Sequence, residues 1–117
     1  ALIDAVRSPN NTRFFAGTDS APHTTKATDC GCAAGCFTGG VAPQLYAKAF
    51  NFNKGHDEFK RFLCLNGPSF YDLPVPSETF SLTDELQDIH ELSTEDGPVV
   101  PLPLGLGENT LPWKISL

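Results

Sequence analysis

Apolar residues at helical spacing predict three helices in the first two thirds of the chain. The first covers residues 1–8, where Leu2, Ile3 and Val6 share one face. The second covers residues 41–52 and the third residues 56–65, each with one apolar face. The sequence Asn66-Gly67-Pro68 follows the third helix, and we expect it to end the helix there.

Between the first two helices, the pattern predicts a short buried strand and a long loop. The strand covers residues 13–17, where Phe14 and Phe15 lead into Gly-Thr-Asp. The loop covers residues 24–40, which are rich in Thr, Ala, Gly and Cys and have little apolar periodicity. A loop of this length in a compact domain is usually functional or mobile.

Residues 71–117 have a different character, because prolines stand on both sides of an acidic stretch. We expect an extended tail in which residues 79–82 and 113–117 alternate like half-buried strands. Residues 84–92 could form a short acidic helix, with Leu86 and Ile89 as its apolar contacts. The predicted division is therefore 1–70 and 71–117.

Length and charge narrow the possible functions. A complete (β/α)8 barrel takes roughly 250 residues, and this chain has 117. Its net charge of −6, without a basic cluster beside aromatic residues, makes nucleic acid and anionic membranes poor partners. No apolar run reaches the length of a spanning helix, and no leader is evident, so we expect a cytoplasmic protein.

The four cysteines allow a thiol site but do not favour one. Cys30, Cys32 and Cys36 crowd into one loop, and Cys64 stands apart. Their C-x-C-x3-C spacing is not the paired-hook pattern of structural zinc. Reduced thiols are the favoured interpretation, and a metal or redox module is the weaker alternative.

Asp19 is the candidate for chemistry, since it follows directly after the predicted strand. A carboxylate at this place can simply cap a turn by accepting backbone N–H bonds. Alternatively, it can act as a metal ligand or general base at the carboxyl end of a barrel strand, where enzymes of that architecture keep their active sites.

Four ordered blocks of sequence favour the second interpretation. They resemble the carboxyl-terminal third of the class II dihydroorotases, in the amidohydrolase superfamily. The blocks are Phe-Phe-Ala-Gly-Thr-Asp-Ser-Ala-Pro-His at 14–23, Cys-Gly-Cys-Ala-Ala-Gly-Cys-Phe at 30–37, Asn-Gly-Pro-Ser-Phe-Tyr at 66–71 and Leu-Pro-Trp-Lys-Ile-Ser-Leu at 111–117.

The resemblance implies a fold and an activity. The fold would be α/β: the last strand and flanking helices of a (β/α)8 TIM-type barrel, followed by an extension with short strands. The activity would be the reversible cyclisation of N-carbamoyl-L-aspartate to dihydroorotate in pyrimidine biosynthesis. Family members use two zinc ions, held by four histidines, one aspartate and, in most of them, a carboxylated lysine.

The resemblance also assigns roles to individual residues. Asp19 matches the aspartate that is both zinc ligand and general base. His23 matches a residue that contacts the substrate carboxylate, and Ala21 a neighbouring backbone contact. Ala34 and Gly35 match a second backbone pair that binds substrate, with Ala33 as the alternative to Ala34.

Two functions of different classes follow. The first is a dihydroorotase part that is inactive alone, because a chain with three histidines and no His-x-His pair cannot complete the zinc site. Its partner would be the missing amino-terminal part of the barrel. The second is a truncated binding or structural protein that self-associates through the edges and faces a partial barrel leaves uncovered.

Overall fold

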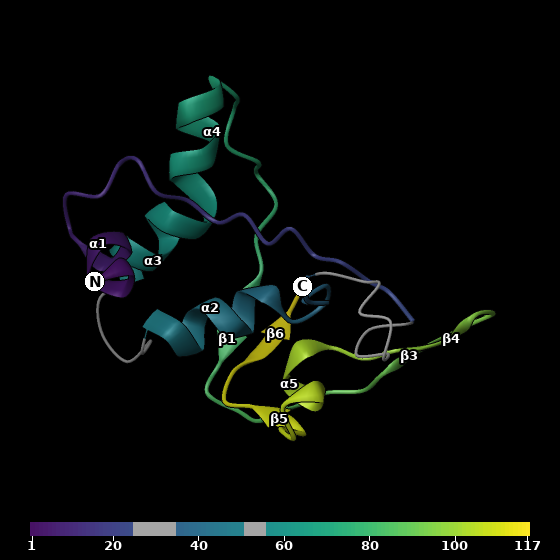
Figure 1. Cartoon of the computed structure of the whole chain (residues 1–117). Helices are drawn as coiled ribbons and strands as arrows, with labels where there is room; N and C mark the ends of the chain where they lie inside the picture. The colour runs from purple at the N-terminus through teal and green to yellow at the C-terminus, as the bar shows by residue number, and fades with distance from the viewer. Residues whose placement is uncertain (25–34, 51–55) are drawn as a thin grey trace.

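The computed structural model describes residues 1–24, 35–50 and 56–117 (Figure 1). The predictions that concern Ala33, Ala34, Cys30 and Cys32 therefore lie outside the described residues. The predicted first and second helices are confirmed as α1 (Leu2–Arg7) and α2 (Ala42–Phe50). Within the described residues, no helix is long and apolar enough to cross a membrane.

The third helix is longer than the sequence predicts. It begins as α3 (His56–Lys60), passes through a π-helical turn η1 (Arg61–Leu65) and continues as α4 (Asn66–Tyr71). The expected stop at residues 66–68 is wrong, because Pro68 falls in the first turn of α4, where an N–H is not needed. The helix ends where Asp72 adopts a left-handed conformation, with φ of 55°.

The first hydrophobic core joins α2 to the long helix. It contains Ala47 and Phe50 of α2 together with Phe59 and Phe62. The ring centroids of Phe50 lie 5.4 Å from Phe59 and 5.1 Å from Phe62, distances typical of favourable aromatic pairs. Val6 of α1 and Ala16 pack on its margin, so the core anchors the segment that leads to Asp19.

Residues 13–17 do not form a strand. The segment is extended, and its Ala16 N–H donates to the Phe62 carbonyl across 3.1 Å. The described residues provide no partner strand beside it, and a strand is defined by such pairing. Instead, Phe15 packs on α4, where a Cβ added to Gly67 would lie 3.4 Å from its ring.

Two buried asparagines hold the segment on α4. The Asn11 Oδ1 accepts N–H bonds from Arg13 and Phe14, at 3.0 and 2.8 Å. The Asn66 Nδ2 donates to the carbonyls of Asn11 and Phe14, at 3.2 and 3.0 Å. These bonds take the place of the ladder that a neighbouring strand would give.

The extension forms three small antiparallel pairs and one short helix. The two strands predicted from the sequence are confirmed, and they pair with each other, with Leu82 opposite Ile115. The pairs are β1 (Ser81–Thr83) with β6 (Lys114–Ser116), β2 (Gln87–Asp88) with β5 (Thr110–Leu111), and β3 (Leu92–Thr94) with β4 (Gly97–Val99); α5 spans Leu102–Gly105. Figure 1 shows the β3–β4 hairpin projecting away from α1 and α4.

The acidic helix expected at residues 84–92 is wrong. Ile89 is buried in a second core with Val41 and Leu111, whereas Leu86 is 70% exposed. The backbone of this stretch pairs with β5 instead, and the Ile89 N–H donates to the Asn109 carbonyl. Two apolar residues gave a weak helical pattern, which tertiary pairing overrode.

Candidate functional site

Asp19 lies at the end of the extended segment, and its side chain is exposed. Its φ of 43° places it in the left-handed region, which residues other than glycine seldom adopt. Aspartate tolerates this region better than most residues. Such a conformation costs free energy and is frequent at functional sites. It therefore supports Asp19 as a candidate functional residue.

The residues after Asp19 are tied to the turn before α2. The Ala21 N–H donates to the Cys36 carbonyl across 2.8 Å. The Ser20 Oγ accepts N–H bonds from Thr38 and Gly39, at 3.1 and 3.0 Å. These contacts span 15 or more residues of sequence, and they bring the Asp19 turn beside residues 36–39.

The structure brings two of the predicted substrate residues to one cavity. His23 and Gly35 both line a space of about 330 Å³, which is bounded on another side by Val100, Leu102 and Leu106 of the extension. Gly35 has a φ of 86°, a conformation that glycine adopts without strain. His23 is exposed, so its imidazole can reach a ligand.

Asp19 and Ala21, the other predicted site residues that the structure describes, do not contribute to this cavity. Ala21 is half-buried, and its N–H and carbonyl are both engaged, the carbonyl by the His23 N–H at 3.1 Å. A substrate contact at Ala21 would therefore use the second lone pair of that carbonyl.

Sequence reasoning missed the contacts of two residues at this site. Ser20 lay inside the recognised block, yet nothing in the block showed which groups its hydroxyl meets. Phe37 is buried, and its carbonyl accepts the Leu102 N–H across 2.8 Å. No local pattern predicts that contact, because 65 residues separate the two partners in the sequence.

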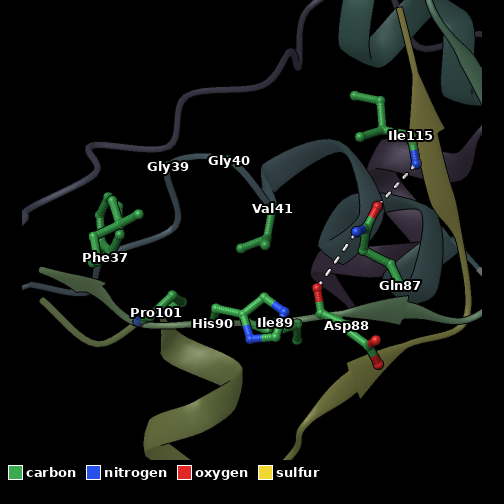
Figure 2. Close-up of a pocket in the computed structure, with 11 residues that line it drawn as sticks. Phe37, Gly39, Gly40, Val41, Gln87, Asp88, Ile89, His90, Pro101 and Ile115 are labelled. Atoms are coloured by element: carbon green, nitrogen blue, oxygen red, sulfur yellow. Dashed lines mark hydrogen bonds between the residues drawn. The ribbon is translucent and has the colours of Figure 1, made fainter.

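A second cavity lies on the other side of Phe37 and Pro101, which line both spaces (Figure 2). It measures about 320 Å³ and is lined mainly by apolar residues, with His90 at its margin. The Gln87 side chain links β2 to β6, since its Oε1 accepts the Ile115 N–H at 3.4 Å. Of the predicted site residues, those that the structure describes do not line this cavity.

The described residues do not form a metal centre. No group of three or more His, Cys, Asp and Glu side chains among them could hold an ion. Zinc sites in proteins use three or four such ligands in fixed geometry. A binuclear zinc site therefore does not fit the residues that the structure describes, and Asp19 would need ligands from elsewhere.

The described cysteines differ in environment. Cys36 is exposed and Cys64 is half-buried in η1, and both are free thiols. Burial raises the pKa of the Cys64 thiol, and nearby Lys60 offsets part of that rise. A raised pKa makes a thiol less reactive near neutral pH, which disfavours a redox role for Cys64.

Several known proteins similar to this chain are named dihydroorotase. No protein-family model matches the chain. The dihydroorotase of Pseudomonas aeruginosa is 44% identical over 118 residues, and that of Cupriavidus metallidurans is 45% identical over 119. These matches cover 98% and 99% of this chain, but only 32% and 33% of the two enzymes.

In sequence, this chain is similar to dihydroorotases. It spans about a third of the length of the curated dihydroorotases that it matches.

Solved dihydroorotases support the same conclusion. The Saccharomyces cerevisiae enzyme, solved in complex with 5-fluoroorotic acid, superposes with a TM-score of 0.81 at 28% identity. The superposition covers 98% of this chain and 33% of the yeast enzyme. The Campylobacter jejuni dihydroorotase gives a TM-score of 0.75 at 24% identity, which supports the fold alone. The architecture is thus the carboxyl-terminal portion of a (β/α)8 barrel with its extension.

Proposed function

We propose that this chain is the part of a dihydroorotase that carries the catalytic aspartate, and that turnover requires the remaining two thirds of the barrel. The observation that carries the proposal is the match to dihydroorotases along 98% of the chain. The substrates would be N-carbamoyl-L-aspartate and dihydroorotate. The cytoplasmic location stays a prediction from the sequence.

Asp19 would serve as the general base and acid. An exposed carboxylate at the end of this extended segment can accept a proton from the attacking water and pass it to the ring nitrogen as the ring opens. The left-handed backbone conformation at Asp19 turns the chain sharply at this residue. Such a strained conformation supports a defined position for the carboxylate rather than a flexible one.

His23 and Gly35 would bind the substrate. They line one cavity, and an imidazolium can pair with a carboxylate through a charge-assisted hydrogen bond. Gly35 lets the backbone approach a small ligand closely, since it has no side chain to obstruct it. The zinc ions would depend on histidines contributed by the rest of the barrel.

A chimera tests this proposal directly. This chain replaces the matching third of the Pseudomonas aeruginosa dihydroorotase, and hydrolysis of dihydroorotate is followed by absorbance. We expect turnover in the chimera and none in the chain alone. The variant Asp19→Asn should lower kcat by about 10²–10⁴-fold, because it removes the proton acceptor.

Asp72→Asn is the matched control. Asp72 is also an exposed aspartate with positive φ, but it lies at the end of α4. We expect it to leave kcat unchanged. Turnover by the isolated chain, or an Asp19→Asn chimera as active as the Asp72→Asn chimera, would refute the proposed function.

A second candidate function is self-association as a binding or structural protein. The observation that favours it is the exposed aromatic surface at α4, where Phe70 is 69% and Tyr71 62% exposed. Exposed apolar patches commonly mark sites of protein association. The same surface fits the first proposal, in which the missing part of the barrel would cover it.

A further inference from the structure

Within the part of the chain that the structure describes, the Ser20 side chain joins the Asp19 turn by hydrogen bonds to the loop beside the cavity. Its hydroxyl oxygen accepts two backbone N–H groups, from Thr38 at 3.1 Å and Gly39 at 3.0 Å. The residue is half-buried, so water competes only partly for these bonds.

The two N–H groups belong to a tightly defined turn. The Thr38 carbonyl accepts the Val41 N–H at 3.1 Å, at the entrance to α2. Gly39 lies against the buried Phe37, where an added Cβ would come within 2.7 Å of the ring. Gly40 has a φ of 80°, which again requires glycine. Ser20 is therefore attached to a rigid part of the molecule.

Asp19 has no comparable attachment of its own. Its backbone is held in the left-handed region, and its side chain is exposed without a hydrogen bond in the described structure. A strained conformation persists only where its surroundings hold it. The nearest holding contacts are those of Ser20 and the bond from the Ala21 N–H to the Cys36 carbonyl.

We propose that Ser20 is a positioning residue, whose hydroxyl fixes the Asp19 turn relative to the turn that follows Gly35. Its importance for catalysis rests on the proposed function. The hydroxyl keeps the general base and the substrate cavity in one relative placement, although it touches neither.

Amide hydrogen exchange on this chain tests the placement without any activity. In Ser20→Ala, the Thr38 and Gly39 amides lose their acceptor, and we expect them to exchange at least about tenfold faster. The Ala21 amide should also exchange faster, because Ser20 no longer holds the turn in place. Ser20→Thr keeps a hydroxyl at this position and should restore slow exchange.

Two internal amides show whether the effect is local. The Ala16 N–H is bonded to the Phe62 carbonyl and the Leu45 N–H to the Val41 carbonyl, and both should keep their rates. Ser69→Ala removes an exposed serine hydroxyl of α4 and should change none of these amides. Unchanged exchange at Thr38 and Gly39 in Ser20→Ala, or equal acceleration at Ala16 and Leu45, would overturn the proposal.

The chimera tests the catalytic consequence. Ser20→Ala should lower kcat about tenfold and raise KM, because both the base and the cavity wall lose their placement, and Ser20→Thr should recover both. If the chimera is active and Ser20→Ala changes neither its kcat nor its KM, the proposed effect of Ser20 on catalysis is overturned. A chimera inactive with Ser20 intact would refute the proposed function instead, and the exchange result would still decide the role of the hydroxyl.

Discussion

At the scale of single residues, buried amides replace missing strand partners. Asn11 and Asn66 together satisfy the backbone of residues 13 and 14, which a barrel strand would otherwise satisfy through its neighbours. An amide suits this task because it offers donors and an acceptor in fixed geometry. The segment that leads to Asp19 thus keeps its shape in this chain.

Asn66→Ala should lower the free energy of unfolding by about 1–3 kcal/mol, since it leaves the Asn11 carbonyl without this buried donor and the Phe14 carbonyl with only the Asn11 Nδ2. Urea denaturation followed by circular dichroism measures the change. Asn10→Ala, at an exposed asparagine whose side chain makes no hydrogen bond in the described structure, should stay within about 0.5 kcal/mol. Equal losses in the two variants would contradict the role of Asn66.

The sequence predicted the candidate residues better than their contacts. Asp19 and His23 could be found because they sit in a recognisable block of ten residues. The hydrogen bonds of Ser20 and Asn66 could not, because their partners lie 18 to 55 residues away and depend on tertiary packing. The positive φ of Asp19 had no local signal either, since aspartate adopts it only in particular turns.

At the scale of elements, periodicity predicted helices well where one face was strongly apolar. α1 and α2 appeared as expected, whereas the end of the long helix and the acidic stretch did not. A Gly-Pro pair usually stops a helix, but the π-helical turn η1 rearranged the bonding ahead of it. In the extension, β1 and β6 were predicted, but the two-residue strands β2 and β5 carry too little pattern to be recognised.

Leu111→Ala should cost about 2–5 kcal/mol of stability, because Leu111 of β5 is fully buried between Val41 and Ile89 and its loss leaves a cavity. Thermal or urea unfolding reports this directly. Leu106→Ala, in the same extension but at a leucine that is 70% exposed, should cost less than about 0.5 kcal/mol. A small loss at Leu111 would show that the second core contributes little.

At the scale of the whole molecule, the chain leaves apolar surface open. Phe15, Phe70 and Tyr71 pack together in tilted and edge-to-face pairs with ring centroids 4.9 to 5.9 Å apart, and the rings of Phe70 and Tyr71 are exposed. Leu73 and Val75 continue the surface along the chain. The dihydroorotases that it matches are about three times as long, so their remaining two thirds could cover such a surface.

We expect the isolated chain to self-associate through this surface as its concentration rises. Sedimentation velocity over a concentration series should show dimers or larger species, and Phe70→Ser should shift them toward monomer. Leu106→Ser removes an equally exposed side chain at a distant place and should have no effect. A clean monomer at all concentrations would contradict this prediction and remove the support for the second candidate function.

The helix α2 belongs to both hydrophobic cores. Ala47 and Phe50 lie in the first core, while Val41 at its entrance and Leu45 along its length lie at the second. Because both cores pack against this helix, a substitution that destabilises one core should also weaken the packing of the other. We therefore expect a destabilising substitution at the start of α2 to weaken the packing of β5, near the carboxyl-terminal end of the sequence, as well.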